Sequence, residues 1–186
     1  MTCASALLTL GLVFSKSPAP VDAPVSVQFA LDGDTLKVHY EVKESAVYGR
    51  GTLNPGQYSF NYDVVELFLS VAGQKGNVPY YEFDVDAAGQ IFQLKIQDPH
   101  HIPPRPTATY GLQAVSTPTD DGWTADLEIP LKALGWKGDP KTVIANAFAV
   151  LGEPSSRAYW SAFLPRSQHL ITFHQPVYFQ PALTCE

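Results

Sequence analysis

A two-residue alternation of apolar and polar side chains recurs in several short segments of this 186-residue chain and constrains its fold more than any other feature. The clearest case is WTADLEIP, whose alternating apolar residues are Trp123, Ala125, Leu127 and Ile129. Successive side chains of a strand point to opposite faces, so this pattern predicts a strand with one buried and one wet face. Sixteen prolines, thirteen glycines and an aromatic content of 12% favour short strands and tight turns over helices. We therefore expect an all-β protein.

Other segments extend this pattern into hairpins and a central strand. Residues 25–30 and 35–43 alternate on either side of a DGD turn signal, and residues 80–96 alternate around an AG turn. Residues 142–152 are mostly β-branched or apolar, which predicts a strand in the middle of a sheet, although their alanines leave a helix possible. Strands are expected to resume at residues 158–163.

The first twenty residues, 1–20, admit two interpretations. Residues 6–14 are nearly all apolar, as in a signal peptide, but no Lys or Arg precedes Lys16, so the basic leading region is missing. The same residues alternate as a half-buried first strand does, and we favour the strand. The apolar run is too short to span a membrane.

One short helix and one loop complete the expected organisation. PLKALG places Pro130 at a first-turn position and Gly135 at the end, the pattern of one or two helical turns, so a helix is predicted at residues 131–135. The four prolines of QDPHHIPPRPTATYG predict a loop. The length suits one domain, residues 1–186, with a sizeable core.

Charge and cysteine content limit the classes of partner. The formal net charge of −6 is spread without long runs of one sign, which disfavours nucleic acid and anionic membranes. Cys3 and Cys185 lie at opposite ends of the chain; they can form a bridge if the termini meet, but two unpaired thiols are the more ordinary interpretation. The sequence favours a cytoplasmic location over a periplasmic or secreted one. It contains no recognisable metal or cofactor motif.

Four motifs in order resemble a known family. DVVELFL, YYEFDVDAAGQIFQLKI, GWTADLEIPLKALG, and YWSAF followed by FHQPVYF resemble the succession in family 9 carbohydrate-binding modules and the related DOMON-like proteins, over residues 25–181. The resemblance implies a β-sandwich of jelly-roll or immunoglobulin-like type, in agreement with the alternation. It also implies non-catalytic binding of a mono-, oligo- or polysaccharide.

The resemblance implies a binding slot formed by Phe60, Glu66 and Trp160. A sugar presents an apolar C–H face and a rim of hydroxyl groups, so a binder needs flat aromatic surfaces and fixed hydrogen-bonding partners. The aromatic rings would stack on the sugar, and the carboxylate of Glu66 would hold two hydroxyl groups. Tyr62 shares the face of Glu66 if the segment is extended, whereas Asp63 points the other way and is expected to cap a turn.

Four further residues are secondary candidates: Glu82, Arg157, Tyr159 and His174. Arg157 can instead pair with Glu66 as a structural salt bridge, and the aromatic residues of the slot can be core residues. If Glu66 and Glu82 meet in one cleft, they provide the acid and base of a glycoside hydrolase, which is the enzymatic alternative.

A second alternative is haem, which some DOMON-like relatives bind. The single methionine, Met1, is terminal, and His100 and His101 lie in the proline-rich loop, where adjacent histidines are poorly placed to bind one ion. His39 has outward parity in its expected strand, which leaves His169 and His174, without an evident partner across the sandwich. We therefore expect no haem, no other cofactor and no metal, and a colourless protein.

Overall fold

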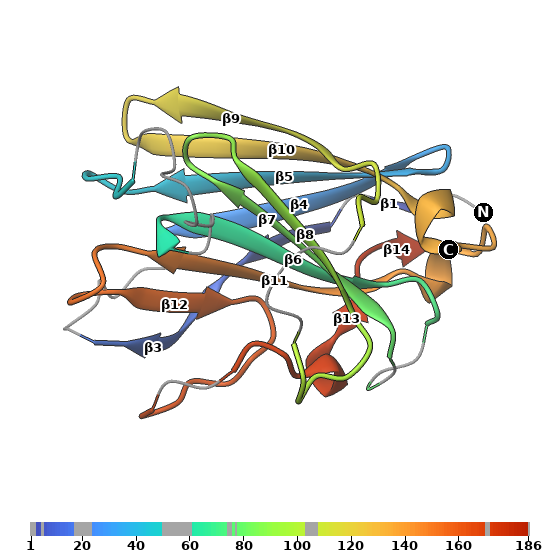
Figure 1. Ribbon diagram of the computed structural model, residues 1–186. Coiled ribbons are helices and arrows are strands. Elements are labelled where there is room, and N and C mark those ends of the chain that lie inside the picture. Colours follow the sequence, from blue (N-terminus) through green and yellow to red (C-terminus); the bar gives the residue numbers. More distant parts are fainter. Residues whose placement is uncertain are drawn as a thin grey trace.

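The computed structural model describes residues 3–4, 6–16, 24–49, 61–73, 76, 78–102, 108–169 and 172–185. The described residues form two antiparallel sheets that pack face to face as a β-sandwich (Figure 1). The predicted all-β fold is confirmed. That the whole chain is one domain stays a prediction.

The smaller sheet has five strands in the order β2-β4-β5-β10-β9. Their bounds are β2 Ala6–Thr9, β4 Val25–Asp32, β5 Thr35–Lys43, β9 Gln113–Thr119 and β10 Gly122–Pro130. The predicted hairpin of β4 and β5 is present, and Asp32 pairs with Thr35 across a two-residue turn. Gly33 opens that turn with a φ of 59°, a conformation that glycine adopts at little cost.

The larger sheet has seven strands in the order β3-β12-β11-β6-β7-β8, with β13 beside β11. Their bounds are β3 Gly11–Ser15, β6 Val64–Ser70, β7 Tyr80–Asp86, β8 Ile91–Ile96, β11 Ile144–Leu151, β12 Ala158–Ser161 and β13 Gln180–Pro181. The predicted hairpin of β7 and β8 and the predicted central strand β11 are confirmed. Every residue of β11 is buried, because both of its faces are covered.

Apolar residues cover both faces of the larger sheet. One face packs against the smaller sheet. In this core between the sheets, the residues of β10 that were predicted to point inward are all buried. The other face carries a second apolar cluster that includes Phe68, Tyr80 and Phe148. Leu164, Phe173 and Phe179, from the segment after β12, pack onto this outer face. The outer face is where the candidate site lies.

The predicted first strand is two strands in two sheets. β2 pairs with β4 in the smaller sheet, whereas β3 pairs with β12 in the larger one. Leu10, which is fully buried, lies between them. The segment therefore changes sheets at Leu10, and the expected single alternation over residues 6–14 does not hold.

The two ends of the chain lie side by side (Figure 1). The short strands β1 Cys3–Ala4 and β14 Thr184–Cys185 are antiparallel, with Cys3 opposite Cys185 in the register. Cys185 is disulfide-bonded. The interpretation of the cysteines as unpaired thiols was therefore wrong, because the sandwich brings the termini together.

Three short 3₁₀ helices, rather than one helix, occur among the described residues. The predicted one spans Leu131–Leu134 and ends at Gly135, whose φ is 88°. The other two span Pro140–Thr142 and Pro176–Tyr178. None of the described helices is long and apolar enough to cross a membrane.

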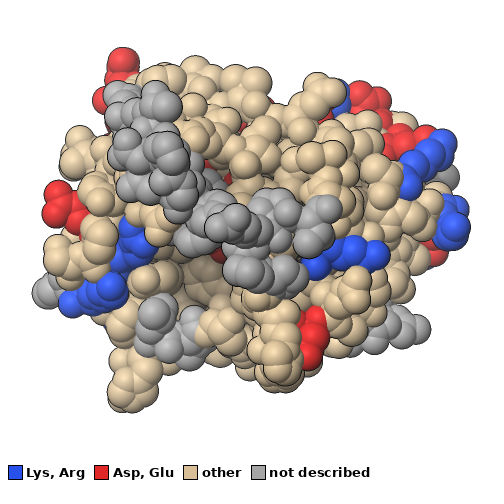
Figure 2. Space-filling view, viewed as in Figure 1, with Lys and Arg blue, Asp and Glu red and all other residues tan. Residues whose placement is uncertain are grey.

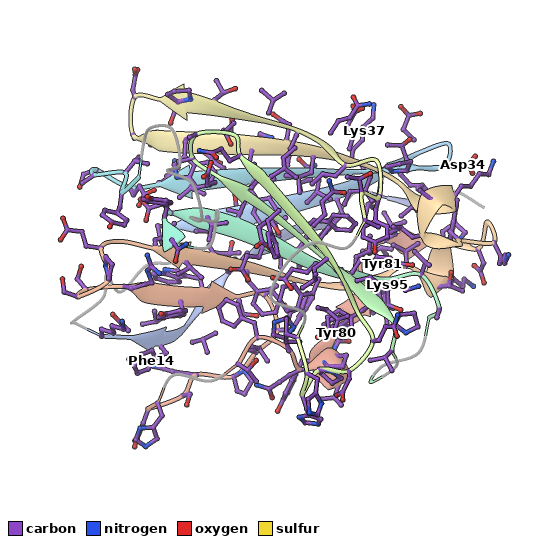
Figure 3. The ribbon with its side chains drawn as sticks, in the orientation of Figure 1. Phe14, Asp34, Lys37, Tyr80, Tyr81 and Lys95 are labelled. Atoms are coloured by element: carbon purple, nitrogen blue, oxygen red, sulfur yellow. The ribbon has the colours of Figure 1, made fainter. Side chains whose placement is uncertain are left out.

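The surface mixes the two signs of charge. Acidic and basic side chains are interspersed on the face seen in Figure 2, as the absence of long charge runs in the sequence indicated. Some long side chains lie along the sheet: Nζ of Lys95 on β8 lies 5.8 Å from the ring centroid of Tyr81 on β7 (Figure 3).

Candidate functional site

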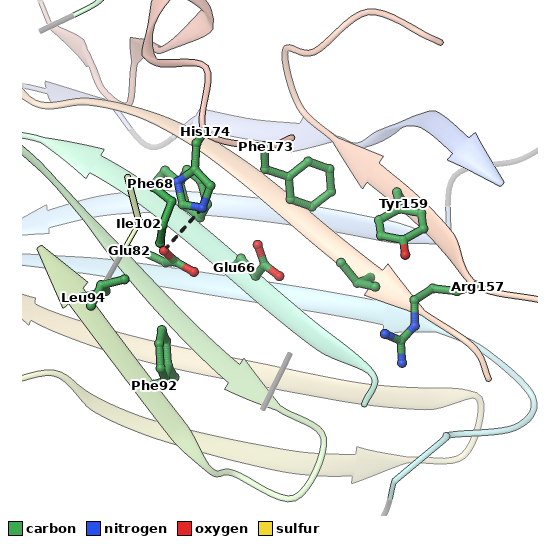
Figure 4. Close-up of a pocket in the computed structure, with 11 residues that line it drawn as sticks. Glu66, Phe68, Glu82, Phe92, Leu94, Ile102, Arg157, Tyr159, Phe173 and His174 are labelled. Carbon is green, nitrogen blue, oxygen red and sulfur yellow. Dashed lines mark ion pairs between the residues drawn. The ribbon is translucent and has the colours of Figure 1, made fainter. Parts of the chain in front are cut away.

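A pocket of about 430 Å³ opens on the outer face of the larger sheet (Figure 4). Strands β6, β7, β8, β11 and β12, the connection between β11 and β12, and the segments after β8 and β12 contribute to it. Its lining residues are Glu66, Phe68, Glu82, Phe92, Leu94, Ile102, Val150, Arg157, Tyr159, Phe173 and His174. The lining thus combines apolar walls with two acids, one arginine and one histidine.

Two neighbouring strands bring three carboxyl groups onto this face. Glu66 on β6 is opposite Asp84 on β7 in the register, and Phe68 is opposite Glu82. Because side chains two apart share a face, Glu82 and Asp84 point to the same side as Glu66. Carboxylate oxygens of the three residues all lie within 4.8 Å of one another.

These carboxyl groups are buried and weakly compensated. Burial raises the pKa of Glu66 and of Asp84 well above the usual values, and raises the pKa of Glu82 to about 7. The repulsion between the neighbouring carboxylates adds to the rise for Glu66 and Asp84, whereas the charge of Arg157 partly lowers the pKa of Glu66. The site therefore favours neutral carboxyl groups or a positively charged partner.

Arg157 and His174 lie on either side of Glu66 in Figure 4. The guanidinium of Arg157 donates to the backbone carbonyl of Asn61 at 2.6 Å. Nε2 of His174 lies 3.9 Å from Oε2 of Glu82. Burial lowers the pKa of His174 to about 4, so the ring is neutral at physiological pH and does not offset the acids.

Aromatic rings form much of the remaining wall. Tyr159 on β12 meets Phe173 edge to face, with 6.0 Å between ring centroids. Phe173 also stacks on Phe148 of β11 at 4.3 Å. Tyr159 is half-buried and presents part of its ring to the pocket, whereas Phe92 of β8 is almost fully buried.

The structure brings together only part of the predicted site. Glu66 and all four secondary candidates line the pocket. Phe60 lies outside the described residues. Tyr62 does not line the pocket; β6 begins at Val64, and the ring of Tyr62 packs against Tyr48 with 5.6 Å between centroids.

Trp160 lies in the core rather than in the pocket. It pairs with Ala149, which pairs with Val65 of β6, and all three belong to the core between the sheets. Its exposed fraction is 1%. Since the next side chain along a strand faces the other way, Tyr159 is the aromatic residue that β12 presents to the pocket.

The predicted structural role of Asp63 is confirmed nearby. Asp63 is buried, and its carboxylate accepts hydrogen bonds from the backbone N–H groups of Gly152 and Tyr48. It therefore connects two loop segments and does not line the pocket. His100 and His101 are exposed on the loop, and His101 contacts Asp98.

Three residues of the site were not predicted from the sequence: Asp84, which joins the carboxyl cluster, and Phe92 and Phe173, which line the pocket. Asp84 has the same parity as Glu82 in YYEFDVD, a usable signal that the resemblance did not single out. Phe173 precedes His174 directly in FHQPVYF, yet no alternation places that loop on the sheet. Of the five histidines, His174 alone lines the pocket, and the absence of haem stays a prediction.

Comparisons with known proteins agree with this architecture. No family model and no curated protein matches the sequence. A crystal structure from Bacteroides uniformis ATCC 8492, provisionally described as a carbohydrate-binding protein, is similar with a TM-score of 0.69 and 21% identity. The match covers 95% of this chain and 84% of that one.

Two other similar structures are family 9 carbohydrate-binding modules from Caldicellulosiruptor kristjanssonii. The complex with glucose has a TM-score of 0.60 at 13% identity, covering 93% of this chain and 82% of that one. The complex with cellotriose has a TM-score of 0.56 at 12% identity, covering 84% and 73%. The chain has the fold of family 9 carbohydrate-binding modules.

This family 9 fold was predicted from the order of four motifs. The part of the resemblance that concerns DOMON-like proteins stays a prediction. Within the fold, the pocket on the outer face of the larger sheet gathers five of the residues that the sequence indicated.

Proposed function

We propose that the chain binds a carbohydrate, without catalysis, in the pocket between Arg157 and His174. The observation that carries the proposal is the lining itself, in which aromatic surfaces and carboxyl groups face one space. A sugar ring needs both, because its C–H face stacks on aromatic rings and its hydroxyl groups need hydrogen-bonding partners. The similar structures with bound glucose and cellotriose support the proposal.

Each polar group has a distinct role in this proposal. Glu66 and Glu82 accept hydrogen bonds from sugar hydroxyl groups when ionised and can also donate when protonated. Arg157 donates to hydroxyl oxygens. Tyr159, half-buried beside Phe173, supplies the stacking surface that was assigned to Trp160 from the sequence.

The volume of the pocket suits a small ligand. Ligand sites of proteins usually measure about 300–1,000 Å³, and this pocket, at about 430 Å³, is near the lower end. We therefore infer that one or two sugar units enter it, as the end of a longer chain or as a free mono- or disaccharide.

Hydrolysis remains the enzymatic alternative because the carboxyl groups are close together. Retaining glycosidases place two carboxyl groups about 5–5.5 Å apart, and oxygens of Glu66, Glu82 and Asp84 lie within 4.8 Å of one another. Such an enzyme also needs one carboxylate that stays ionised while its neighbour is protonated. Here burial raises the pKa of all three groups, which favours binding over catalysis.

Calorimetric titration with glucose, cellotriose, galactose and mannose tests the proposal. We expect saturable binding of at least one sugar, weakened about tenfold or more by Tyr159→Ala and largely retained in Tyr159→Phe. Tyr110→Ala is the matched control, because Tyr110 is also half-buried but packs against Tyr81 away from the pocket.

Two outcomes would count against binding in this pocket: no heat with any sugar, or an affinity that Tyr159→Ala leaves unchanged. Release of reducing ends from a polysaccharide that Glu66→Gln abolishes would favour the enzymatic alternative instead.

A further inference from the structure

Three buried carboxyl oxygens at the pocket, on two residues, have no hydrogen-bond donor among the described residues. No N–H or O–H group in the described parts of the chain donates to Oε2 of Glu82 or to either oxygen of Asp84. Asp84 is fully buried, and Glu82 is 7% exposed. Buried oxygens are almost always satisfied, so these three atoms call for a partner.

The nearby cationic side chains do not supply that partner. Arg157 lowers the pKa of Glu66, but it donates no hydrogen bond to Oε2 of Glu82 or to the oxygens of Asp84. Nε2 of His174 is 3.9 Å from Glu82, and the low pKa of this ring keeps it neutral. The hydroxyl of Tyr80 is directed to Nδ1 of His174, at 2.8 Å, rather than to an acid.

The oxygens converge as ligands of one ion do. All three residues offer atoms within 4.8 Å of one another, and Ca²⁺ binds oxygens at about 2.3–2.6 Å, so one ion can bridge donors up to about 5 Å apart. Carboxylate oxygens are hard ligands, which favour Ca²⁺ or Mg²⁺ over Zn²⁺. Mg²⁺ needs about 2.1 Å and near-octahedral geometry, a tighter demand than these side chains from two strands suit.

We propose that Glu66, Glu82 and Asp84 bind one Ca²⁺ ion at the inner end of the pocket. Glu66 and Glu82 line the pocket, so the ion has a route from solvent, and water in the pocket completes its coordination. A divalent cation satisfies the orphaned oxygens and offsets the repulsion that three neighbouring carboxylates exert on one another when ionised. The proposal does not depend on the sugar.

The test uses the intact chain, freed of cations with a chelator, and CaCl₂ alone as the probe. We expect one Ca²⁺ per chain by calorimetry, a melting temperature that rises saturably with Ca²⁺, and a weaker response to MgCl₂. Asp84→Asn should weaken Ca²⁺ binding at least tenfold. Asp126→Asn, which removes an exposed acid from the other sheet, is the matched control and should bind as the wild type does.

A second measurement needs no variant. The melting temperature of the wild type should rise with CaCl₂ and return to its starting value when excess chelator is added. Absence of Ca²⁺ binding, a melting temperature that Ca²⁺ does not raise, or equal affinity in Asp84→Asn and wild type would each overturn the proposal. The acids would then share protons among themselves.

Discussion

The hydroxyl oxygen of Tyr80 lies 2.8 Å from Nδ1 of His174, and so it joins β7 to the segment that closes the outer face of the larger sheet. The same histidine stacks on Phe68, with 4.8 Å between ring centroids. These contacts hold the ring beside Glu82, where burial keeps it neutral. Because the pKa of Glu82 is raised and that of His174 is lowered, the acid favours the folded state at low pH and the histidine favours it at higher pH.

The first prediction concerns Glu82. Burial raises its folded-state pKa from 4.5 to about 7, so its contribution to stability is complete below pH 4.5 and is lost as the pH rises through 7. Relative to Glu82→Gln, the free energy of unfolding of the wild type should fall by roughly 2–3 kcal/mol over this range. Urea unfolding at several pH values, in buffers that contain a chelator, measures the difference.

The control for this experiment is Glu128→Gln, which removes one exposed acid from the smaller sheet. His174 acts in the opposite sense: its lowered pKa gives stability that is present above pH 6.5 and is lost as the pH falls toward 4. Comparison of Glu82→Gln with the wild type isolates the acid. A difference that does not change with pH would contradict the prediction.

The second prediction concerns Asp63. Its carboxylate accepts from the backbone N–H of Gly152 at 2.5 Å and from that of Tyr48. Asp63→Ala leaves both donors without a partner and should lower the free energy of unfolding by roughly 2–4 kcal/mol. Asp126→Ala is the matched control, since it breaks only an exposed contact with His39. Equal melting temperatures for the two variants would argue against a capping role.

The third prediction separates Trp160 from the pocket. Trp160→Phe leaves a cavity between the sheets and should lower the free energy of unfolding by about 1–3 kcal/mol. The affinity of the folded variant for sugar should stay within about twofold of the wild type, because the side chain faces away from the pocket. A tenfold loss of affinity in a fully folded variant would restore the stacking role.

The fourth prediction concerns the bond at Cys185. Reduction with dithiothreitol should lower the free energy of unfolding by about 2–4 kcal/mol, because the disulfide restricts the unfolded chain. Cys185→Ser should have the same low melting temperature with or without reductant. If reduction leaves the melting temperature of the wild type unchanged, the bond contributes nothing to stability.

Local alternation predicted the strands well where one face is wet. The alternating residues of β10 were recognisable because apolar side chains mark the buried face of such a strand. The turn at Gly33 was recognisable from its local DGD sequence. β9 was missed because Gln113–Thr119 is polar and contains Pro118, which an edge strand tolerates but an inner strand does not.

The candidate site was predicted in part, because its geometry depends on pairing between distant strands. Glu66 was identified through the resemblance of DVVELFL to a family motif, whereas the choice between Tyr159 and Trp160 depends on the register of β12 with β11. One residue of slip exchanges the two faces, and no local pattern fixes that register. Tyr62 was expected to share the face of Glu66 in an extended strand. Because β6 begins at Val64, Tyr62 lies outside the strand and that expectation does not hold.

The change of sheet at Leu10 has a consequence for how the sandwich opens. β2 and β3 form one edge of the smaller and of the larger sheet, respectively, and one continuous segment supplies both. If that segment peels away, β4 and β12 lose their outer neighbours at the same moment. Amide protons on these two strands, which belong to different layers, should therefore become accessible to exchange in a single opening event.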